Sequence, residues 1–392
     1  MADDPIVVVG MARTPMGGLL GELSGLAAAD LGAAAIKAAV ADAKIKPEDV
    51  EQVLMGNVLQ AGQGQAPARQ AALGAGLPKS VEAVTLNKMC GSGLQAIVAG
   101  ANAIAVGDAS VIVAGGMESM SNAPFLMAKH RTGQKYGHDK LLDHMALDGL
   151  EDAYEHQAMG VYADQVAKEY QFTREMQDAY ALETLARAQA ATKEGRFKRE
   201  IAPVVADRKS GATVDTDELP RKAKPEKIPQ LKPAFTQGGT VTAANASAIS
   251  DGAAAVVLMR ESEAKKRGLK VLARIVSSAA HAHEPAYFTT APVPAVKKAL
   301  ARADWQAGDV DLWEVNEAFA VVPMIAMTEL GITQDKINVN GGACALGHPI
   351  GASGARVLVT LIAALEAHGK KRGVATLCIG GGEGIAMAVE RG

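Results

Sequence analysis

Cys90 lies where a strand-like segment ends and a helical one begins, within NKMCGSGLQAI. A thiol at a helix N-terminus feels the positive end of the helix dipole, which favours the thiolate. The glycines that follow leave room for a substrate and present backbone N–H groups toward it. The local sequence therefore leaves two interpretations open, a nucleophile and a small buried side chain beside a tight turn.

His348 lies among small residues in GGACALGHPIGASGAR, and Pro349 follows it. Proline fixes the local backbone and removes one donor, so the histidine sits in a shaped turn. We interpret His348 as a general base toward a thiol. The alternative is a histidine held by backbone hydrogen bonds alone.

Cys378 ends an apolar strand in TLCIGGGEG, and Asn316 ends another in WEVNEAFA. The glycines after Cys378 can aim N–H groups at a developing oxyanion. They lack the G-x-G-x-x-G order of a dinucleotide site. For Asn316, the local sequence is equally typical of a helix N-cap.

The remaining cysteine and the paired histidines do not favour a metal site. Cys344 has no base or charge near it in sequence, and we interpret it as packing. His281 and His283 alternate as on a strand, without an acidic or cysteine partner at ligand spacing, so we predict no catalytic metal. With no CxxC pair, reduced thiols are expected.

The four chemical residues share one kind of position. Cys90, Asn316, His348 and Cys378 all fall at strand ends or in Gly-rich loops, where α/β folds place their sites. Acyl transfer needs a nucleophile, a base and donors for an oxyanion. Forming a carbon–carbon bond needs one more group, to take a proton from a carbon beside a carbonyl. Two thiols and a histidine supply that set.

Apolar strand-like runs alternate with Ala-rich helical stretches, which predicts an α/β fold. Three motifs recur in the same order about 260 positions apart, which indicates two similar halves. The pairs are DVEQVLMGNVLQ with DVDLWEVNEAFA, VTLNKMCGSGLQAI with INVNGGACALGHPIGASGARVL, and VIVAGGMES with ATLCIGGGEG.

A segment of different composition separates the halves. Residues 119–244 are denser in charged residues than the flanking segments and carry much of the proline, yet TREMQDAYALETLARAQAATKEGRF is a clear amphipathic helix. We therefore predict an ordered insertion. The expected domains are residues 1–118 with 245–271, the inserted loop domain 119–244, and residues 272–392.

Composition excludes several classes of function. The 392 residues are 48% hydrophobic with a formal net charge of -3, so nothing favours nucleic acid or an anionic membrane. We also predict that no apolar run reaches the length of a membrane span. The chain begins MADDPIVVVG, whereas a signal or transit peptide begins basic, so we expect a cytoplasmic protein.

The motifs NKMCGSGLQA, GGMESMSNAP, NEAFA, GGACALGHPIGASGAR and CIGGGEG resemble those of the thiolases in order and spacing. The resemblance runs from Ile6 to Glu390 and is nearest to short-chain acetyl-CoA acetyltransferases. It implies the thiolase fold, an α/β fold with two similar five-layered halves and a loop domain that covers coenzyme A. It also implies a homotetramer and a place in fatty acid metabolism.

The resemblance assigns roles to matching positions. Cys90 accepts the acyl group, His348 activates it, and Cys378 exchanges a proton with Cα of the second acyl-CoA. One oxyanion hole comes from His348 and a water held by Asn316. The other comes from the N–H groups of Cys90 and Gly380. Acetyl-CoA, acetoacetyl-CoA and coenzyme A are the implied ligands, and no separate cofactor is expected.

Contacts to coenzyme A follow in the same way. Arg221 falls near the nucleotide end, where its basic neighbours Lys222 and Lys224 suit phosphates. A solvated surface loop is the alternative for this segment. Ser247 matches a residue beside the pantetheine and Phe288 one in the acyl pocket. The implied tunnel residues are Ala243, Phe235, Ala318, Phe319, Leu150 and Met159.

Some positions depart from the family pattern. Ala158 replaces a histidine common before Met159, and His156 lies two positions earlier. Leu219 stands where potassium-binding members have tyrosine, so we do not expect potassium activation. Glu383 replaces a Met or Gln, without a mechanistic reason. We expect condensation of two acetyl-CoA to acetoacetyl-CoA; the alternatives are a degradative 3-ketoacyl-CoA thiolase of broader chain length and a non-catalytic thiolase-like lipid carrier.

Overall fold

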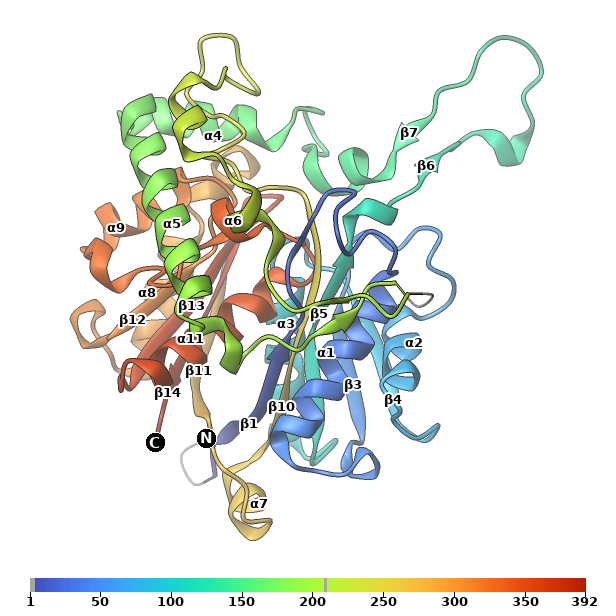
Figure 1. The fold of residues 1–392 in the computed structure, drawn as a ribbon, viewed down its shortest axis with the longest axis vertical. Helices are drawn as coiled ribbons and strands as arrows, with labels where there is room; N and C mark the ends of the chain where they lie inside the picture. The colour runs from blue at the N-terminus through green and yellow to red at the C-terminus, as the bar shows by residue number, and fades with distance from the viewer. Residues whose placement is uncertain (1–3, 208–209) are drawn as a thin grey trace.

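The computed structural model describes residues 4–207 and 210–392, and its centre is one large mixed β-sheet (Figure 1). The strands follow the order β12-β13-β14-β11-β1-β10-β5-β3-β4, and the short β2 (Gly17–Gly18) pairs with β10. The bounds are β1 (Ile6–Arg13), β3 (Gln52–Gly56), β4 (Glu82–Leu86), β5 (Ile112–Ser119), β10 (Ser250–Arg260), β11 (Ala273–Ala282), β12 (Leu312–Val315), β13 (Arg372–Ile379) and β14 (Glu383–Glu390).

The two halves of the sheet have the same topology, as the repeated motifs predicted. The first half runs β1-β10-β5-β3-β4 and the second β11-β14-β13-β12, extended by a parallel bridge from Trp313 to Ile337. In each half the first two pairings are antiparallel and the following ones parallel. β1 and β11 join the halves through only Val7 and Val8 of β1.

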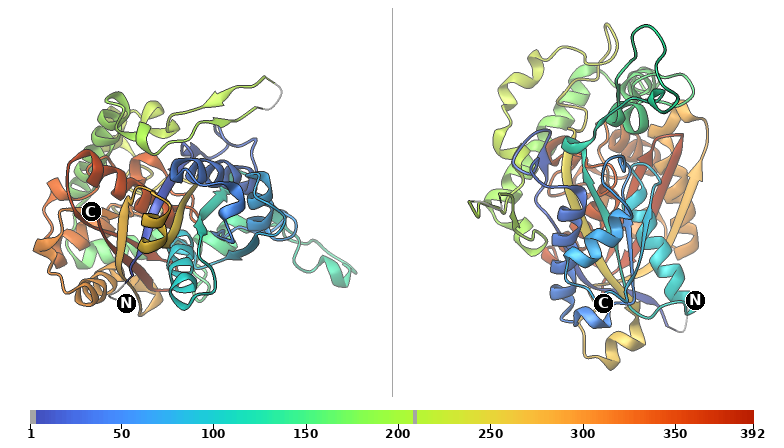
Figure 2. Two further views of the ribbon diagram at one scale, coloured as in Figure 1. Left: turned by 90° about the horizontal axis from the view of Figure 1, so that it is seen from below. Right: turned by 90° about the vertical axis from the view of Figure 1, so that its right-hand side faces the viewer.

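Helices form three layers around this sheet (Figure 2). α1 (Ala28–Ala43) and α2 (Pro67–Gly74) cover the first half, and α8 (Pro292–Ala303) and α9 (Val321–Leu330) cover the second. α3 (Ser92–Val106) and α11 (Ser353–Ala367) pack together between the two halves. The thiolase-type fold is thus present, but its five layers are formed by both halves together and not by each half, because α3 and α11 share the middle layer.

The small residues of the middle helices allow this close packing. A Cβ on Gly93 would lie 2.7 Å from the backbone nitrogen of Ala355, and one on Gly354 would lie 2.3 Å from that of Leu94. The segment Met89–Val106 is apolar enough, by length and composition, to cross a membrane. This corrects the prediction that no run reaches that length. Its place between the sheet halves is that of a core helix of the described fold.

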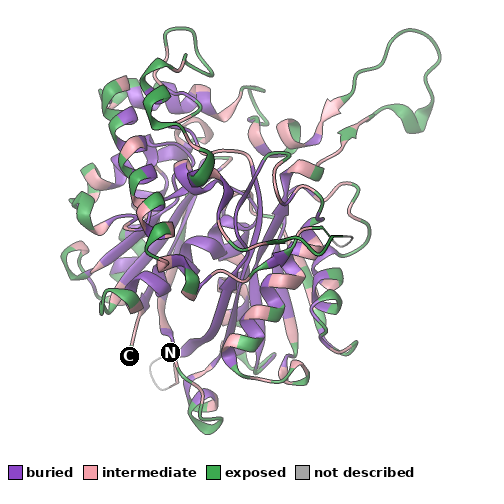
Figure 3. Cartoon of the chain, viewed as in Figure 1, coloured by how far each residue is buried: buried purple, intermediate pink, exposed green. Residues whose placement is uncertain are grey.

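The inserted region follows β5 and returns to the sheet at β10. The amphipathic helix expected there is α5 (Arg174–Lys193), where the Thr173 side chain accepts a hydrogen bond from the Met176 N–H at 3.3 Å. A hairpin of β6 and β7 extends away from the body and is exposed along most of its length (Figures 1 and 3). The other α-helices and strands of the insertion are α4 (Met159–Glu169), α6 (Glu218–Lys222), β6 (Phe125–Leu126), β7 (Leu142–Asp143), β8 (Val204–Val205) and β9 (Thr213–Val214). Outside the insertion lie the short helices α7 (Glu261–Lys266) and α10 (Ala343–Leu346).

A buried ion-pair cluster ties this insertion to β1. The guanidinium of Arg13 binds Glu200 at 2.6 Å and Asp217 at 2.7 and 2.9 Å, and all three side chains are fully buried. Because the partners come from the insertion, the cluster holds the loop domain against the first half. Removing Asp217 would take two acceptors from the buried guanidinium and leave Glu200 as its only ion-pair partner in this cluster.

Candidate active site

One cavity of about 530 Å³ brings the nucleophile and the base together. Cys90 reaches it from the turn before α3, His348 from the loop after α10, and Gly380 from the loop between β13 and β14. The cavity wall also contains Leu19, Gly149, Leu150, Met159, Gly160, Leu219, Ala234, Phe235, Ala243, Ala246, Ser247, Ala248, Ile249, Phe288, Ala318, Phe319 and Ile350.

Cys90 is half-buried, and hydrogen bonds shape the turn that carries it. The Ser92 hydroxyl accepts from the Lys88 N–H at 2.8 Å and donates to the Met89 carbonyl at 2.7 Å. Met89 adopts a left-handed backbone, with φ of 46°. The resulting turn places Cys90 before the helix, whose N-cap is Gly91.

Burial outweighs the effect of the helix dipole on the protonation state of Cys90. Burial raises the pKa of this thiol to about 11. The backbone N–H groups of Gly380 and of Cys90 itself lower the pKa, but by less. The charge of Glu118 raises it slightly further. The resting nucleophile is therefore a thiol that needs a base.

His348 is held as a neutral base with one defined tautomer. Its Nδ1 lies 2.6 Å from the Ser353 hydroxyl oxygen, and that hydroxyl is 3.0 Å from the Pro349 carbonyl. Since the hydroxyl donates to the carbonyl, it accepts from Nδ1–H and leaves the Nε2 lone pair free. Burial, with a smaller contribution from Arg356, lowers the His348 pKa to about 3. Ser353 was missed from sequence, although it shares the Gly-rich motif of His348.

Asn316 lies beside the histidine ring. Its side-chain nitrogen is 3.5 Å from both ring nitrogens of His348. Its side-chain oxygen is 3.5 Å from the Arg356 guanidinium, which pairs with buried Glu314 at 3.2 Å. Because the cation faces the amide oxygen, the amide N–H group is turned toward the histidine. Burial raises the Glu314 pKa to about 8.

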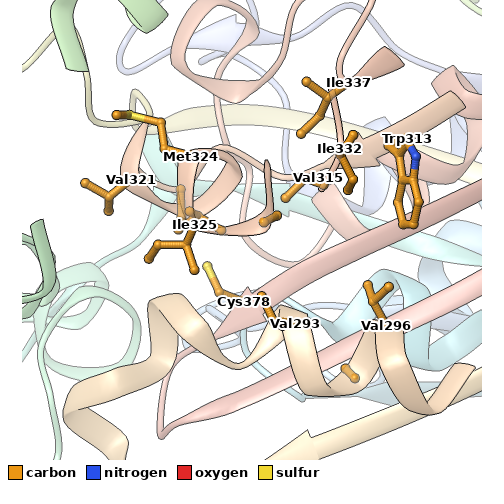
Figure 4. Packing of buried hydrophobic residues seen from close by; sticks show 14 of the residues in the cluster. Val293, Val296, Trp313, Val315, Val321, Met324, Ile325, Ile332, Ile337 and Cys378 are labelled. Atoms are coloured by element: carbon orange, nitrogen blue, oxygen red, sulfur yellow. The ribbon is translucent and has the colours of Figure 1, made fainter. Parts of the chain in front are cut away.

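Cys378 is fully buried and lies behind the cavity wall. Its side chain points toward Ile325 and belongs to the apolar cluster with Val293 (Figure 4). Burial raises the Cys378 pKa well above its usual range, and the charge of Cys90 is the next cause. The Cys90 thiol is thus close enough to affect the pKa of Cys378 electrostatically.

Cys344 has a different environment. Its N–H donates to the Glu317 carboxylate at 3.0 Å, and its thiol lies 3.6 Å from the Glu317 carbonyl. Burial, and then the Glu317 charge, raise the Cys344 pKa well above its usual range. The same carboxylate accepts from Tyr180 at 2.9 Å and from Asn338 at 2.7 Å. These contacts support the interpretation of Cys344 as packing.

Most of the predicted coenzyme A contacts line the catalytic cavity. The Ser247 N–H donates to the Ala318 carbonyl at 2.9 Å, so this hydrogen bond connects the segment before β10 with the segment after β12. Arg221 is not among the lining residues, because its guanidinium binds Glu22 at 2.6 Å. The predicted residues that line the cavity are Ser247, Ala243, Phe235, Leu150, Met159, Phe288, Ala318 and Phe319.

The positions that depart from the family pattern are also placed. His156 is exposed and does not line the cavity. It therefore does not take the place of the histidine that many family members have at the position of Ala158. Leu219 contributes an apolar side chain to the wall. Within residues 4–207 and 210–392, no group of three His, Cys, Asp or Glu side chains is arranged to hold a metal ion.

The fold and the site define an acyltransferase-type α/β protein with a cysteine nucleophile, a neutral histidine and a second buried thiol. The chain belongs to the thiolase family: residues 6–262 match the thiolase N-terminal domain and residues 269–391 the thiolase C-terminal domain. It is 51% identical to the acetyl-CoA acetyltransferase of Cupriavidus necator, over 98% of this chain and 99% of that one.

Two further relatives cover the whole chain. The cytosolic acetyl-CoA acetyltransferase of Mus musculus is 50% identical over 99% of both chains. The crystal structure of Acat5 thiolase from Ascaris suum in complex with coenzyme A matches with a TM-score of 0.94. It is 43% identical and covers 99% of this chain and 100% of that one.

Proposed function

We propose that this chain catalyses the reversible condensation of two acetyl-CoA to acetoacetyl-CoA and coenzyme A through an acetyl-Cys90 intermediate. The observation that carries the proposal is the arrangement of one cavity. The Cys90 sulfur meets the N–H groups of Cys90 and Gly380, beside a neutral His348. Full-length relatives named acetyl-CoA acetyltransferase support it.

The first half-reaction transfers an acetyl group to sulfur. His348 takes the Cys90 proton, and the thiolate attacks the thioester carbonyl of acetyl-CoA. The N–H groups of Cys90 and Gly380 stabilise the oxyanion. The carbon–sulfur bond to coenzyme A then breaks, and His348 returns the proton to that leaving thiolate.

The second half-reaction forms the carbon–carbon bond. Cys378 gives its own proton to neutral His348 and then, as a thiolate, takes a proton from the methyl carbon of a second acetyl-CoA. The protonated His348, and a water held by Asn316, stabilise the enolate oxygen. The carbanion attacks acetyl-Cys90, the Cys90 thiolate leaves, and His348 returns its proton to it. The two sulfurs must be neighbours for the carbanion to reach the acetyl group, and the effect of Cys90 on the Cys378 pKa supports this.

Three aromatic rings support a preference for short acyl chains. The Phe319 ring centroid lies 6.0 Å from that of Phe235 and 6.2 Å from that of Phe288, both edge-on. These rings fill one wall of the cavity. We infer that they limit the acyl group to a few carbons and that coenzyme A enters past Ser247. Arg221 stays a proposed contact of the nucleotide end.

The test is thiolysis of acetoacetyl-CoA beside longer and 2-methyl-branched 3-ketoacyl-CoA substrates, with and without potassium. We expect acetoacetyl-CoA to have the highest kcat/KM, without potassium activation. Higher kcat/KM on long chains would instead favour the broader 3-ketoacyl-CoA thiolase. Mass spectrometry after incubation with acetyl-CoA should find an acetyl group on Cys90. A folded protein without that adduct would be a carrier and not an enzyme.

We also propose a homotetramer in the cytoplasm. Large apolar side chains are exposed on the β6–β7 hairpin; Phe125 is 64% exposed and Tyr136 fully so. Exposed apolar groups on an extended arm are typical of an interface. Light scattering with size-exclusion chromatography tests this, and shortening the hairpin between Met127 and Leu141 should yield a smaller oligomer. Cytosolic relatives support the location.

A further inference from the structure

Two loops supply the N–H groups that meet the Cys90 sulfur. One is the nucleophile turn, residues 87–91, before α3. The other is the glycine loop, residues 380–382, between β13 and β14. Gly381 and Gly382 have φ of 89° and 83°, which an L side chain rarely adopts. An oxyanion hole shared by two loops works only if their separation is fixed.

An ion pair connects these two loops. The Lys88 ammonium contacts the Glu383 carboxylate, and both side chains are partly buried, with exposed fractions of 24% and 34%. Lys88 lies two residues before the nucleophile. Glu383 closes the glycine loop, where it pairs with Ile379 across the β13–β14 hairpin and with Ala282 of β11.

Apolar contacts alone do not fix the distance between the two loops, so the ion pair can affect it. A Cβ on Gly91 would lie 2.4 Å from the Ile379 side chain, so the nucleophile turn rests directly on β13. A Cβ on Gly380 would have the Met89 side chain at 3.8 Å, an ordinary contact that allows small shifts. The two loops are therefore in tight contact at Gly91, whereas the packing around Gly380, the oxyanion donor, leaves room for small shifts.

We propose that the Lys88–Glu383 ion pair positions the Gly380 N–H relative to the Cys90 N–H. Both are positioning residues, since neither lines the cavity. The inference rests on the proposed function and deepens it. It also gives a role to Glu383, which has none in the catalytic steps above. Because oxyanion stabilisation acts on the transition state, losing the pair should lower kcat and leave KM nearly unchanged.

The experiment compares Glu383→Gln, Glu383→Lys and the exchange Lys88→Glu/Glu383→Lys in thiolysis of acetoacetyl-CoA. Losing one oxyanion donor costs about 100-fold or more, so a displaced donor in Glu383→Gln should cost about tenfold in kcat. Glu383→Lys should be slower still, because two ammonium groups then repel. The exchange should restore kcat to within about threefold of the wild type, because it re-forms an ion pair.

The matched control is Glu263→Gln, which removes a carboxylate that binds Lys266 and Arg267 on α7. Glu263→Gln should have the kcat of the wild type. Its midpoint of thermal unfolding should be similar to that of Glu383→Gln. Hydrogen–deuterium exchange of peptides spanning 87–91 and 380–383 gives a readout independent of turnover, with faster exchange expected in Glu383→Gln alone.

The outcomes separate this inference from the proposed function. If wild-type protein has no thiolase turnover, the proposed function fails, and the exchange rates still test the ion pair. If the wild type is active but Glu383→Gln matches Glu263→Gln in kcat and in hydrogen–deuterium exchange, the positioning role is wrong. It is also wrong if the double variant Lys88→Glu/Glu383→Lys has a kcat as low as that of Glu383→Lys. If Glu383→Gln does not fold, Lys88→Gln takes its place under the same criteria.

Discussion

The rate at which iodoacetamide alkylates Cys90 should rise with pH far into the alkaline range. Burial raises the Cys90 pKa to about 11, so at pH 8 the thiolate is three pH units below its midpoint. About one molecule in a thousand then carries the reactive thiolate, whereas an ordinary thiol would be about a quarter ionised. The alkylation rate should therefore increase about tenfold per pH unit between pH 7 and 10.

Mass spectrometry of the peptide that contains Cys90 measures this rate after timed quenching. Circular dichroism at each pH confirms that the chain stays folded. Cys344→Ala removes one competing thiol, and Cys90→Ser identifies the signal. A rate that levels off below pH 9 would mean that the helix dipole or His348 holds a thiolate, and the reasoning from burial would be refuted.

Acetylation by acetyl-CoA should depend on pH differently. Burial lowers the His348 pKa to about 3, so the base is neutral throughout pH 5–8. A histidine of ordinary pKa near 6.5 would lose base function as the pH falls through that value. We expect no inflection near pH 6.5 in the single-turnover rate of Cys90 acetylation. A fall of about fivefold between pH 6.5 and 5.5 would show that His348 titrates normally.

Three substitutions test other parts of the site. Cys90→Ala should abolish turnover, whereas Cys344→Ala should keep most of it; equal losses in a coupled thiolysis assay would undo their separate roles. Ser353→Ala removes the acceptor of Nδ1–H, and one hydrogen bond corresponds to about a two- to twelvefold fall in kcat; an unchanged kcat would mean the tautomer is fixed otherwise. Asp217→Ala leaves Arg13 underpaired and should lower the free energy of unfolding by about 3–5 kcal/mol, measured in urea; a loss below about 1 kcal/mol would contradict the buried network.

The sequence points to the candidate reacting groups because their signals are local. Cys90, His348 and Asn316 each stand at a strand end or in a Gly-rich loop, and the motifs repeat. The positioning groups leave no such signal. Arg356 is an ordinary helix residue in sequence, and only the packing of α11 turns its guanidinium toward Asn316 at 3.5 Å.

Two features of the site depend on groups that are distant in sequence. The local sequence shows the helix dipole that favours a thiolate at Cys90, but burial in the fold has the larger effect on the pKa. Similarly, the basic stretch around Arg221 does not reveal the ion pair that Arg221 forms. Its partner Glu22 lies 199 positions away and became visible only in the fold.

The duplication explains why one cavity brings the nucleophile and the base together. Cys90 precedes α3 of the first half, and His348 precedes α11 of the second, so equivalent helix starts meet at the centre. They meet because Gly93 and Gly354 have no Cβ to separate the two backbones. Neither half alone contains both nucleophile and base. The proposed chemistry therefore depends on the interface between the halves, and that interface depends on glycines that do not line the cavity.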